Sequence, residues 1–286
     1  MTTEKRPLAR RRVGTIIWWL ILPLALGLLL STLVPRPIVG LIYLDGPIGS
    51  FSARNLVAQI AYAREHWEVR SVVLVMNSPG GTAVDTESVY MELARLRQTR
   101  PVVTLVEGMT ASGAYYLAAG TDYIIAKPSS EVGSIGVLNL LPPQPIVTED
   151  LVTTGPYKAW GAPPDAVMRE LETVKQGFFQ AVKLGRGEAL RVEPQVLLRG
   201  EIWLGTDALR MGLVDELGSQ SRAVEKAAQL GRLPQYRVAD LREMAGLPIV
   251  SEELFFIQSP EGNTTSYPRE PGLYLLYIPP TERRLP

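Results

Sequence analysis

The chain has 286 residues, a formal net charge of zero, one histidine and no cysteine. This length suits one large domain or two small ones. The neutral charge gives no indication of a nucleic-acid partner, and the lack of cysteine excludes disulfides, thiolate metal sites and cysteine nucleophiles. One histidine excludes a histidine-rich metal site and leaves a single candidate for a Ser-His-Asp triad.

The N-terminus has the pattern of a membrane anchor. Residues 14–34 contain no charged side chain and are rich in Ile, Leu and Trp, and about 20 apolar residues suffice to span the hydrocarbon core. Residues 1–13 form a basic tail, whereas only Arg36 follows the apolar run closely. The positive-inside rule therefore predicts a single-pass protein of the cell membrane, with a cytoplasmic N-terminus and an extracytoplasmic remainder. A cleaved signal peptide is the alternative, but its apolar core would be shorter and would end in small residues.

Strands and helices alternate after this segment. The apolar spacing predicts strands at residues 37–44, 69–76, 101–106 and 121–126, with helices at residues 53–66, 82–97 and 115–119 between them. This order is typical of an α/β fold, a mainly parallel sheet covered by helices. Two further helices are expected at residues 166–185 and 221–230, so residues 35–232 are interpreted as one domain.

Residues 233–286 differ in character from this domain. Proline, glycine and acidic residues become frequent and the helical periodicity fades, so we interpret this region as an extension of unknown role. Residues 273–278 are apolar, lie between two prolines and predict one isolated strand. Because a lone strand needs a sheet to join, it is expected to dock on its own domain, to dock on a neighbouring subunit, or to stay undocked.

Ser112 is a candidate nucleophile. It follows the apolar strand at residues 101–106 and precedes an apolar run that suits a buried helix. At the start of a helix, free N–H groups and the positive end of the dipole can stabilise an oxyanion, and a serine hydroxyl there can act as a nucleophile. Serine is also a preferred helix cap, so a capping role alone is the alternative.

Gly80 and Gly81 are candidate partners of Ser112. They lie between the strand at residues 69–76 and the next helix, and two glycines let a ligand approach main-chain N–H groups closely. Their spacing is not that of a dinucleotide or phosphate loop. Because loops that leave neighbouring parallel strands meet at one edge of the sheet, these N–H groups are expected to converge with Ser112 on one oxyanion.

His66 is interpreted as structural. It lies at the polar end of the helix at residues 53–66, where a cationic side chain suits the helix dipole. A base for Ser112 must therefore be sought elsewhere in the chain.

Five motifs together resemble the signal peptide peptidase A family. They are residues 77–81 (NSPGG), 111–116 (ASGAYY), 133–137 (GSIGV), 154–158 (TGPYK) and 200–218 (GEIWLGTDALRMGLVDELG). The resemblance runs from residue 37 to residue 230, and the single core behind one apolar segment is similar to the short form of the family. It implies a fold related to Clp protease and the crotonases, with residues 35–232 as a serine protease domain.

The resemblance implies a serine nucleophile and a lysine base, which in this chain are Ser112 and Lys158. A lysine with the ordinary pKa of about 10.4 stays protonated at neutral pH, but burial disfavours the charged form, and the residues beside Lys158 are apolar. The N–H groups of Gly80 or Gly81 and of Gly113 are then expected to hold the oxyanion.

Ser134 is a secondary candidate. The resemblance implies that its loop lies near the pocket, where its hydroxyl would orient the lysine, and a plain turn residue is the alternative. One position departs from the family pattern, because Ala159 stands where members often carry an acidic residue.

The resemblance also implies substrates and partners. Hydrophobic peptides near the membrane, such as cleaved signal peptides, are the expected substrates, and no metal or other cofactor is implied. The expected assembly is a homo-oligomeric ring whose sites are shared between adjacent protomers. Two alternative functions stay open: an acyl-CoA enzyme of crotonase type, and a non-catalytic membrane scaffold of the same fold.

Overall fold

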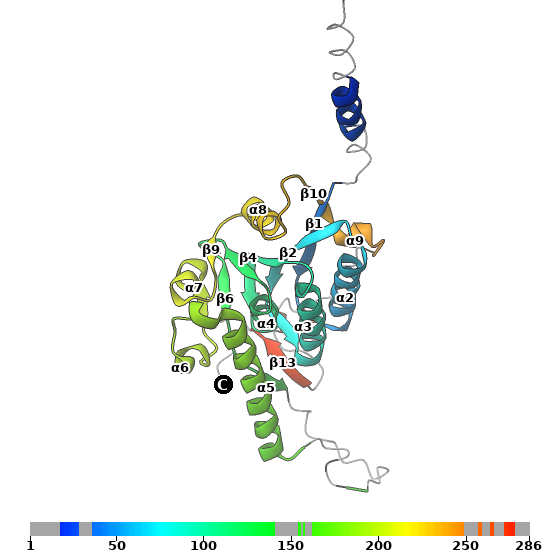
Figure 1. The fold of residues 1–286 in the computed structure, drawn as a ribbon. Helices are drawn as coiled ribbons and strands as arrows, with labels where there is room; N and C mark the ends of the chain where they lie inside the picture. The colour runs from blue at the N-terminus through cyan, green and yellow to red at the C-terminus, as the bar shows by residue number, and fades with distance from the viewer. Residues whose placement is uncertain are drawn as a thin grey trace, which may run out of the picture.

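The computed structural model describes residues 18–28, 36–140, 154–155, 157, 162–248, 257–258, 264–265 and 272–277. Its centre is an eight-stranded sheet with the path β10–β1–β2–β4–β5–β9, which β6 and β8 extend beside β4 (Figure 1). All described pairs in this sheet are parallel except β6 with β8, which confirms the predicted mainly parallel sheet. Its strands are β1 (Ile38–Asp45), β2 (Val69–Ser78), β4 (Val102–Ala111), β5 (Tyr123–Ala126), β6 (Glu131–Gly133), β8 (Ile202–Leu204), β9 (Glu216–Leu217) and β10 (Arg237–Asp240).

Two hydrophobic cores cover the two faces of the sheet. On β2, Val72 and Leu74 belong to one core and Val73 to the other, as the alternation of side chains along a strand requires. Figure 1 shows α8 on one side of the sheet and α2, α3 and α4 on the other. The helices are α2 (Ser50–Glu65), α3 (Ala83–Arg97), α4 (Gly113–Ala119), α5 (Pro164–Arg186), η1 (Gly187–Ala189), α6 (Pro194–Leu197), α7 (Gly205–Met211), α8 (Gln220–Leu230) and α9 (Leu241–Met244).

Several elements extend beyond their predicted bounds. The strand expected at residues 101–106 continues as β4 to Ala111, because residues 109–111 pair with β6. The charged Glu107 and the following Gly108, which has no side chain, interrupt the apolar pattern and hide this continuation. β10 pairs in parallel with β1, so the main sheet continues beyond residue 232 into the predicted extension.

A second, three-stranded sheet lies where β2 ends. Its order is β3 (Gly80–Thr82), β13 (Gly272–Leu276) and β7 (Leu138–Leu140), and both pairs are antiparallel. β13 is the strand that the sequence left without a partner, and it docks on its own domain (Figure 1). A separate antiparallel pair joins β11 (Ile257–Gln258) and β12 (Thr264–Thr265).

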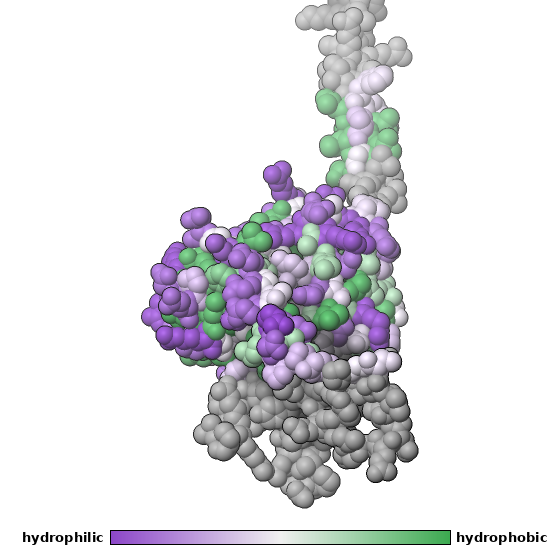
Figure 2. Space-filling model, turned by 90° about the horizontal axis from the view of Figure 1, so that it is seen from below, coloured by the Kyte–Doolittle hydropathy of each residue, from purple (hydrophilic) through white to green (hydrophobic). Residues whose placement is uncertain are grey.

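Part of the predicted membrane anchor is described. Residues 18–28 are helical and their side chains are exposed, and Figure 2 shows green apolar residues on this helix beside a body whose surface is largely purple. Within the described ranges, no helix combines the length and the apolar character that crossing a membrane requires.

A buried ion pair joins the end of α5 to the sheet. The Arg186 guanidinium donates to both carboxylate oxygens of Asp215, at 2.6 and 3.0 Å, and to the carbonyl oxygen of Gly212 at 2.9 Å. Asp215 also accepts the backbone N–H of Ile124 at 2.7 Å. Burial raises the pKa of the neighbouring Tyr115 hydroxyl above its usual range, so this hydroxyl stays protonated and donates to the carbonyl oxygen of Leu213.

Asp215→Ala should lower the free energy of unfolding by about 3 kcal/mol, because it leaves the Arg186 charge buried without its partner. The measurement is urea unfolding of the full chain, followed by circular dichroism. Asp207→Ala is the matched control, since Asp207 pairs with the exposed Arg210 and an exposed pair contributes little. Equal effects of the two substitutions would contradict the structural role of the buried pair.

Candidate active site

The loops that carry Gly80 and Ser112 meet at one edge of the main sheet. β2 and β4 are parallel neighbours, and Ser78 is in register with Thr110, so the residues that follow both strands leave the sheet at the same end. A Cβ atom built on Gly80 would lie 2.7 Å from the backbone nitrogen of Gly113. The structure therefore brings together the candidate nucleophile and its candidate glycine partners.

Ser112 has a strained backbone. Its φ of 53° and ψ of −119° lie outside the regions that L-residues ordinarily adopt, a conformation that costs about 1–3 kcal/mol. Two hydrogen bonds hold it there: the Ser112 N–H donates to the carbonyl oxygen of Gly133 at 2.8 Å, and its own carbonyl oxygen accepts from the N–H of Tyr116 at 2.9 Å. A sharp strand-to-helix turn of this kind is typical of serine nucleophiles in hydrolases.

The Ser112 side chain does not cap the helix that it precedes. Ser112 occupies the N-cap position of α4, yet its hydroxyl makes no capping hydrogen bond, and the residue is only 1% exposed. The alternative role of Ser112 as a helix cap would require a hydrogen bond from a backbone N–H of α4 to its hydroxyl, and this bond is not made. A buried serine without a capping role is available for chemistry at the strand end.

Gly80 and Gly81 bring the main chain of β3 close to its neighbours. Gly80 has a φ of +95°, which favours glycine, and its N–H donates to the hydroxyl of Ser78 at 3.2 Å. A Cβ atom on Gly81 would lie 1.9 Å from the carbonyl oxygen of Ile48. Both positions thus require glycine, and an oxyanion would compete with Ser78 for the Gly80 N–H.

Gly81→Ala should displace β3, because the new methyl group would meet a backbone oxygen that has no room to move. We expect the free energy of unfolding to fall by at least about 2 kcal/mol, measured by urea unfolding. Gly136→Ala is the control, since a Cβ atom there meets nothing within 4 Å. If Gly81→Ala proves as stable as Gly136→Ala, the close approach at β3 is wrong.

Ser134 lies beside the serine turn. It directly follows Gly133, whose carbonyl oxygen accepts from Ser112, and its own N–H donates to the carbonyl oxygen of Glu201 at 2.7 Å. It is largely buried and also has a positive φ of 53°. This position agrees with a loop near the pocket, while the proposed orienting role stays a prediction.

Lys158 lies outside the described residues, together with residue 156 and residues 159–161. Its role as the base therefore stays a prediction from the resemblance.

His66 lies at the other end of the sheet from Ser112. It ends α2 just before β2 begins, its ring stacks on Tyr62 at 3.6 Å, and its Nδ1 lies 3.0 Å from the carbonyl oxygen of Tyr62. β2 is a ten-residue strand, and ten residues of strand span roughly 33 Å, which is far beyond the reach of proton transfer. The structural interpretation of His66 fits this geometry.

Sequence reasoning assigned no role to two residues that support the site. The Oγ1 atom of Thr86 on α3 would lie 2.7 Å from a Cβ atom on Gly113, so it packs against the residue after the nucleophile. The carboxamide oxygen of Asn77 accepts from the N–H of Met109 at 3.1 Å, beside an irregularity in the register of β2 and β4. Asn77 belongs to the 77–81 motif, so the sequence did mark this position as part of the site. No motif or periodicity in the sequence marks Thr86.

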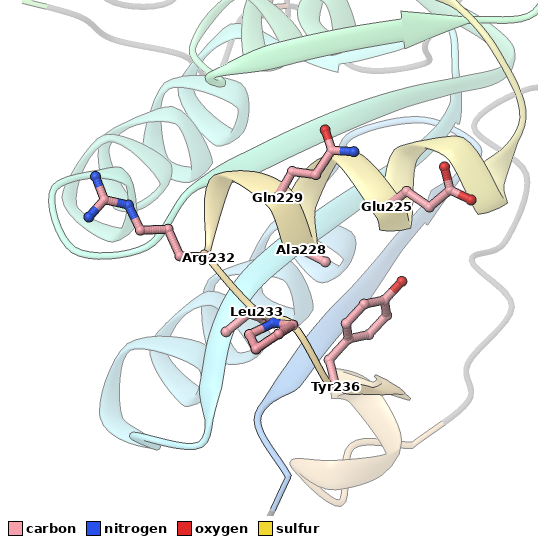
Figure 3. A pocket seen from close by; sticks show the side chains of 7 residues that line it. Glu225, Ala228, Gln229, Arg232, Leu233 and Tyr236 are labelled. Carbon is pink, nitrogen blue, oxygen red and sulfur yellow. The ribbon is translucent and has the colours of Figure 1, made fainter.

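A cavity lies away from this site. It has a volume of about 460 Å³ and is lined by α8 and the segment that follows it (Figure 3). α8 packs on the face of the sheet opposite α3 and α4. In the described part of the chain, no group of three or more His, Asp and Glu residues is placed to hold a metal ion.

Comparison with known proteins identifies the family. The sequence profile of peptidase family S49 matches residues 94–233, and the profile of Clp protease matches residues 38–132. A putative protease of Synechocystis sp. is 30% identical over 217 residues, which cover 71% of this chain and 78% of that protein. The chain belongs to peptidase family S49. Its α/β fold with a mainly parallel sheet is accordingly of the Clp protease type.

Other relatives of this S49 chain carry more specific names. Protease 4 of Haemophilus influenzae is 34% identical over 182 residues, which are 59% of this chain and 29% of that protein. A putative signal peptide peptidase SppA of Enterococcus faecium is 27% identical over 207 residues, which are 67% of this chain and 60% of that protein. This chain therefore spans only about a third of the Protease 4 that it matches.

Proposed function

We propose that this member of family S49 is a membrane-anchored serine endopeptidase of signal peptide peptidase type. The observation that carries the proposal is the strained, buried and uncapped Ser112, which lies beside Gly80 and Gly113. The names of the relatives, Protease 4 and signal peptide peptidase, support peptide bonds as the target.

The proposed mechanism uses a Ser-Lys pair. Neutral Lys158 takes the proton of the Ser112 hydroxyl as its oxygen attacks the peptide carbonyl carbon. The N–H groups of Gly80 or Gly81 and of Gly113 stabilise the oxyanion. The amine leaves with the proton from Lys158, and a water activated by the same lysine hydrolyses the acyl-enzyme and frees Ser112.

The setting of the enzyme is also part of the proposal. Residues 14–34 anchor the chain, and the catalytic domain lies on the extracytoplasmic side, where hydrophobic peptides such as cleaved signal peptides are the substrates. The chain assembles as a homo-oligomeric ring in which Ser112 of one protomer works with Lys158 of the next. Head-to-tail contacts of this kind close into cyclic symmetry.

Ser112→Ala and Lys158→Ala should each reduce hydrolysis of a fluorogenic hydrophobic peptide by at least about a thousandfold, and the double variant should be no worse, because the pair acts as a unit. Ser88→Ala is the control, since Ser88 is an exposed serine on α3 whose hydroxyl donates to the carbonyl oxygen of Val84. Full activity in Ser112→Ala would exclude Ser112 as the nucleophile. Loss of activity in a folded His66→Ala variant would transfer the role of the base to His66.

The pH dependence of hydrolysis tests the lysine separately. Burial lowers the pKa of a lysine because it disfavours the charged form, and only the neutral form accepts a proton. Activity should therefore be low below the lowered pKa, rise through it and level off above it. A profile governed by a group that titrates at the ordinary histidine value, about 6.5, would contradict a lysine base.

A further inference from the structure

The first residues of the central strands gather at one edge of the main sheet. β10, β1, β2 and β4 are parallel neighbours, so their starts lie together, at the end of the sheet opposite Ser112. The N–H of Ile38 donates to the carbonyl oxygen of Glu68 at 2.7 Å, and the N–H of Arg237 donates to that of Pro37 at 2.9 Å. Figure 1 shows β10 beside the start of β1 at one end of the domain and β13 at the other. We call this surface the entry edge, and it consists of residues 36–38, 67–70, 98–102 and 231–237.

Exposed arginines line the entry edge. Arg36, Arg70, Arg232 and Arg237 all have exposed side chains, and none of the four belongs to an ion pair among the described residues. Because a guanidinium is always charged at neutral pH, these side chains give the edge a positive charge that no neighbouring carboxylate neutralises.

The acidic residues nearest to this edge do not offset the charge. Asp122 pairs with Arg97 at 2.5 Å, so its carboxylate is already neutralised. Glu65 and Glu68 lie in the same region, but they are two against the four exposed arginines. The entry edge therefore keeps a net positive charge.

Arg100 brings a further guanidinium close to Arg70. Burial and the Arg70 charge lower the pKa of Arg100 below its usual range, and the Arg100 side chain donates to the carbonyl oxygens of Ala63 and Arg64 at 2.9 and 3.3 Å. Arg232 is also near, since a Cβ atom on the preceding Gly231 would lie 3.3 Å from the Cβ atom of Ser71. An anion placed among these groups would relieve the repulsion between like charges.

An exposed tryptophan lies beside the arginines. Trp67 is 62% exposed at the turn between α2 and β2, although a tryptophan side chain is large and mostly apolar. Tryptophan is enriched where proteins meet the membrane–water interface, because its ring is apolar while its N–H is polar. Guanidinium groups match phosphate groups with two parallel hydrogen bonds. The combination is typical of a surface that meets lipid headgroups.

The length of the chain ties this edge to the proposed anchor. The apolar run ends at residue 34 and β1 begins at Ile38, and four residues of extended chain reach at most about 14 Å. If residues 14–34 span the hydrocarbon core, the entry edge lies within that distance of it. The headgroup layer covers the core there, so lipid phosphates are the nearest anions.

We propose that the entry edge is a docking surface for anionic lipid headgroups, in which Arg70, Arg232 and Arg237 bind lipid phosphates and Trp67 enters the interface. The inference rests on the membrane anchoring in the proposed function and adds the orientation of the domain. β2 has ten residues, which span roughly 33 Å from this edge to the candidate active site. The domain thus stands on its entry edge, and a hydrophobic peptide has to leave the bilayer before it reaches Ser112.

The orientation can be measured with one fluorophore, because the chain has no cysteine of its own. Gln98→Cys at the end of α3 and Val84→Cys at its start are exposed positions at opposite ends of one helix, and each would carry a nitrobenzoxadiazole label. The full chain is reconstituted into vesicles of phosphatidylcholine, with or without about 30% phosphatidylglycerol, and a nitroxide-headgroup lipid serves as quencher. Quenching at residue 98 should be at least about twofold stronger in the anionic vesicles, whereas residue 84 should show no change.

Charge reversal then tests the arginines. Arg70→Glu/Arg237→Glu, introduced with Gln98→Cys, should abolish the additional quenching in anionic vesicles. Arg54→Glu/Arg169→Glu is the matched control, since it makes the same change of charge at exposed arginines of α2 and α5, and it should keep that quenching.

Extraction with alkaline carbonate reports on the anchor separately. Equal quenching at residue 98 in both kinds of vesicle, or equal loss in both double variants, by a chain that resists extraction would overturn the docking surface and leave the anchor standing. Quenching that depends on Arg70 and Arg237 in a chain that carbonate extracts would uphold the docking surface and refute the anchor. Extraction without any quenching would refute both.

Discussion

The parallel register of β2 and β4 is the constraint on which the site depends. Ser78 lies opposite Thr110, so the chain leaves both strands at one edge, toward β3 in one case and toward α4 in the other. A slip of either strand would separate Gly80 from Gly113, whose backbone atoms approach closely. The central strands are buried on both faces, and a one-residue slip would exchange the side chains of the two cores. Core packing thereby fixes the geometry of the candidate active site.

The strain at Ser112 is sustained by its neighbours. The contact from the Ser112 N–H to Gly133 and the start of α4 hold the turn from two sides, and the buried residues of α4 pack into the core. Strain of this kind persists only where the surroundings determine it. β13 adds a third support to this turn, because its Leu275 packs against Gly80 and Gly113. The same strand completes the small sheet beside the candidate nucleophile.

The sequence predicted the parts of the structure that local pattern determines. The apolar, β-branched runs predicted β1, β2, β4 and β5, and the order of elements predicted the parallel sheet. The motifs around Gly80 and Ser112 then predicted their meeting at one edge. The docking of β13 was left open, because its partners Gly80–Thr82 and Leu138–Leu140 are short loop strands that no periodicity marks. Thr86 was missed for a similar reason, since a buried threonine inside a helix carries no local sign of what it supports.

The identity of the nucleophile is the central claim, and mapping a covalent adduct tests it most directly. Full-length wild type and Ser112→Ala would be treated with a fluorophosphonate probe, digested and sequenced by mass spectrometry. The account predicts a single phosphonylated residue in the wild type, Ser112, and no adduct in Ser112→Ala. An adduct on another residue such as Ser134, or unmodified Ser112 in the wild type after prolonged treatment, would contradict it.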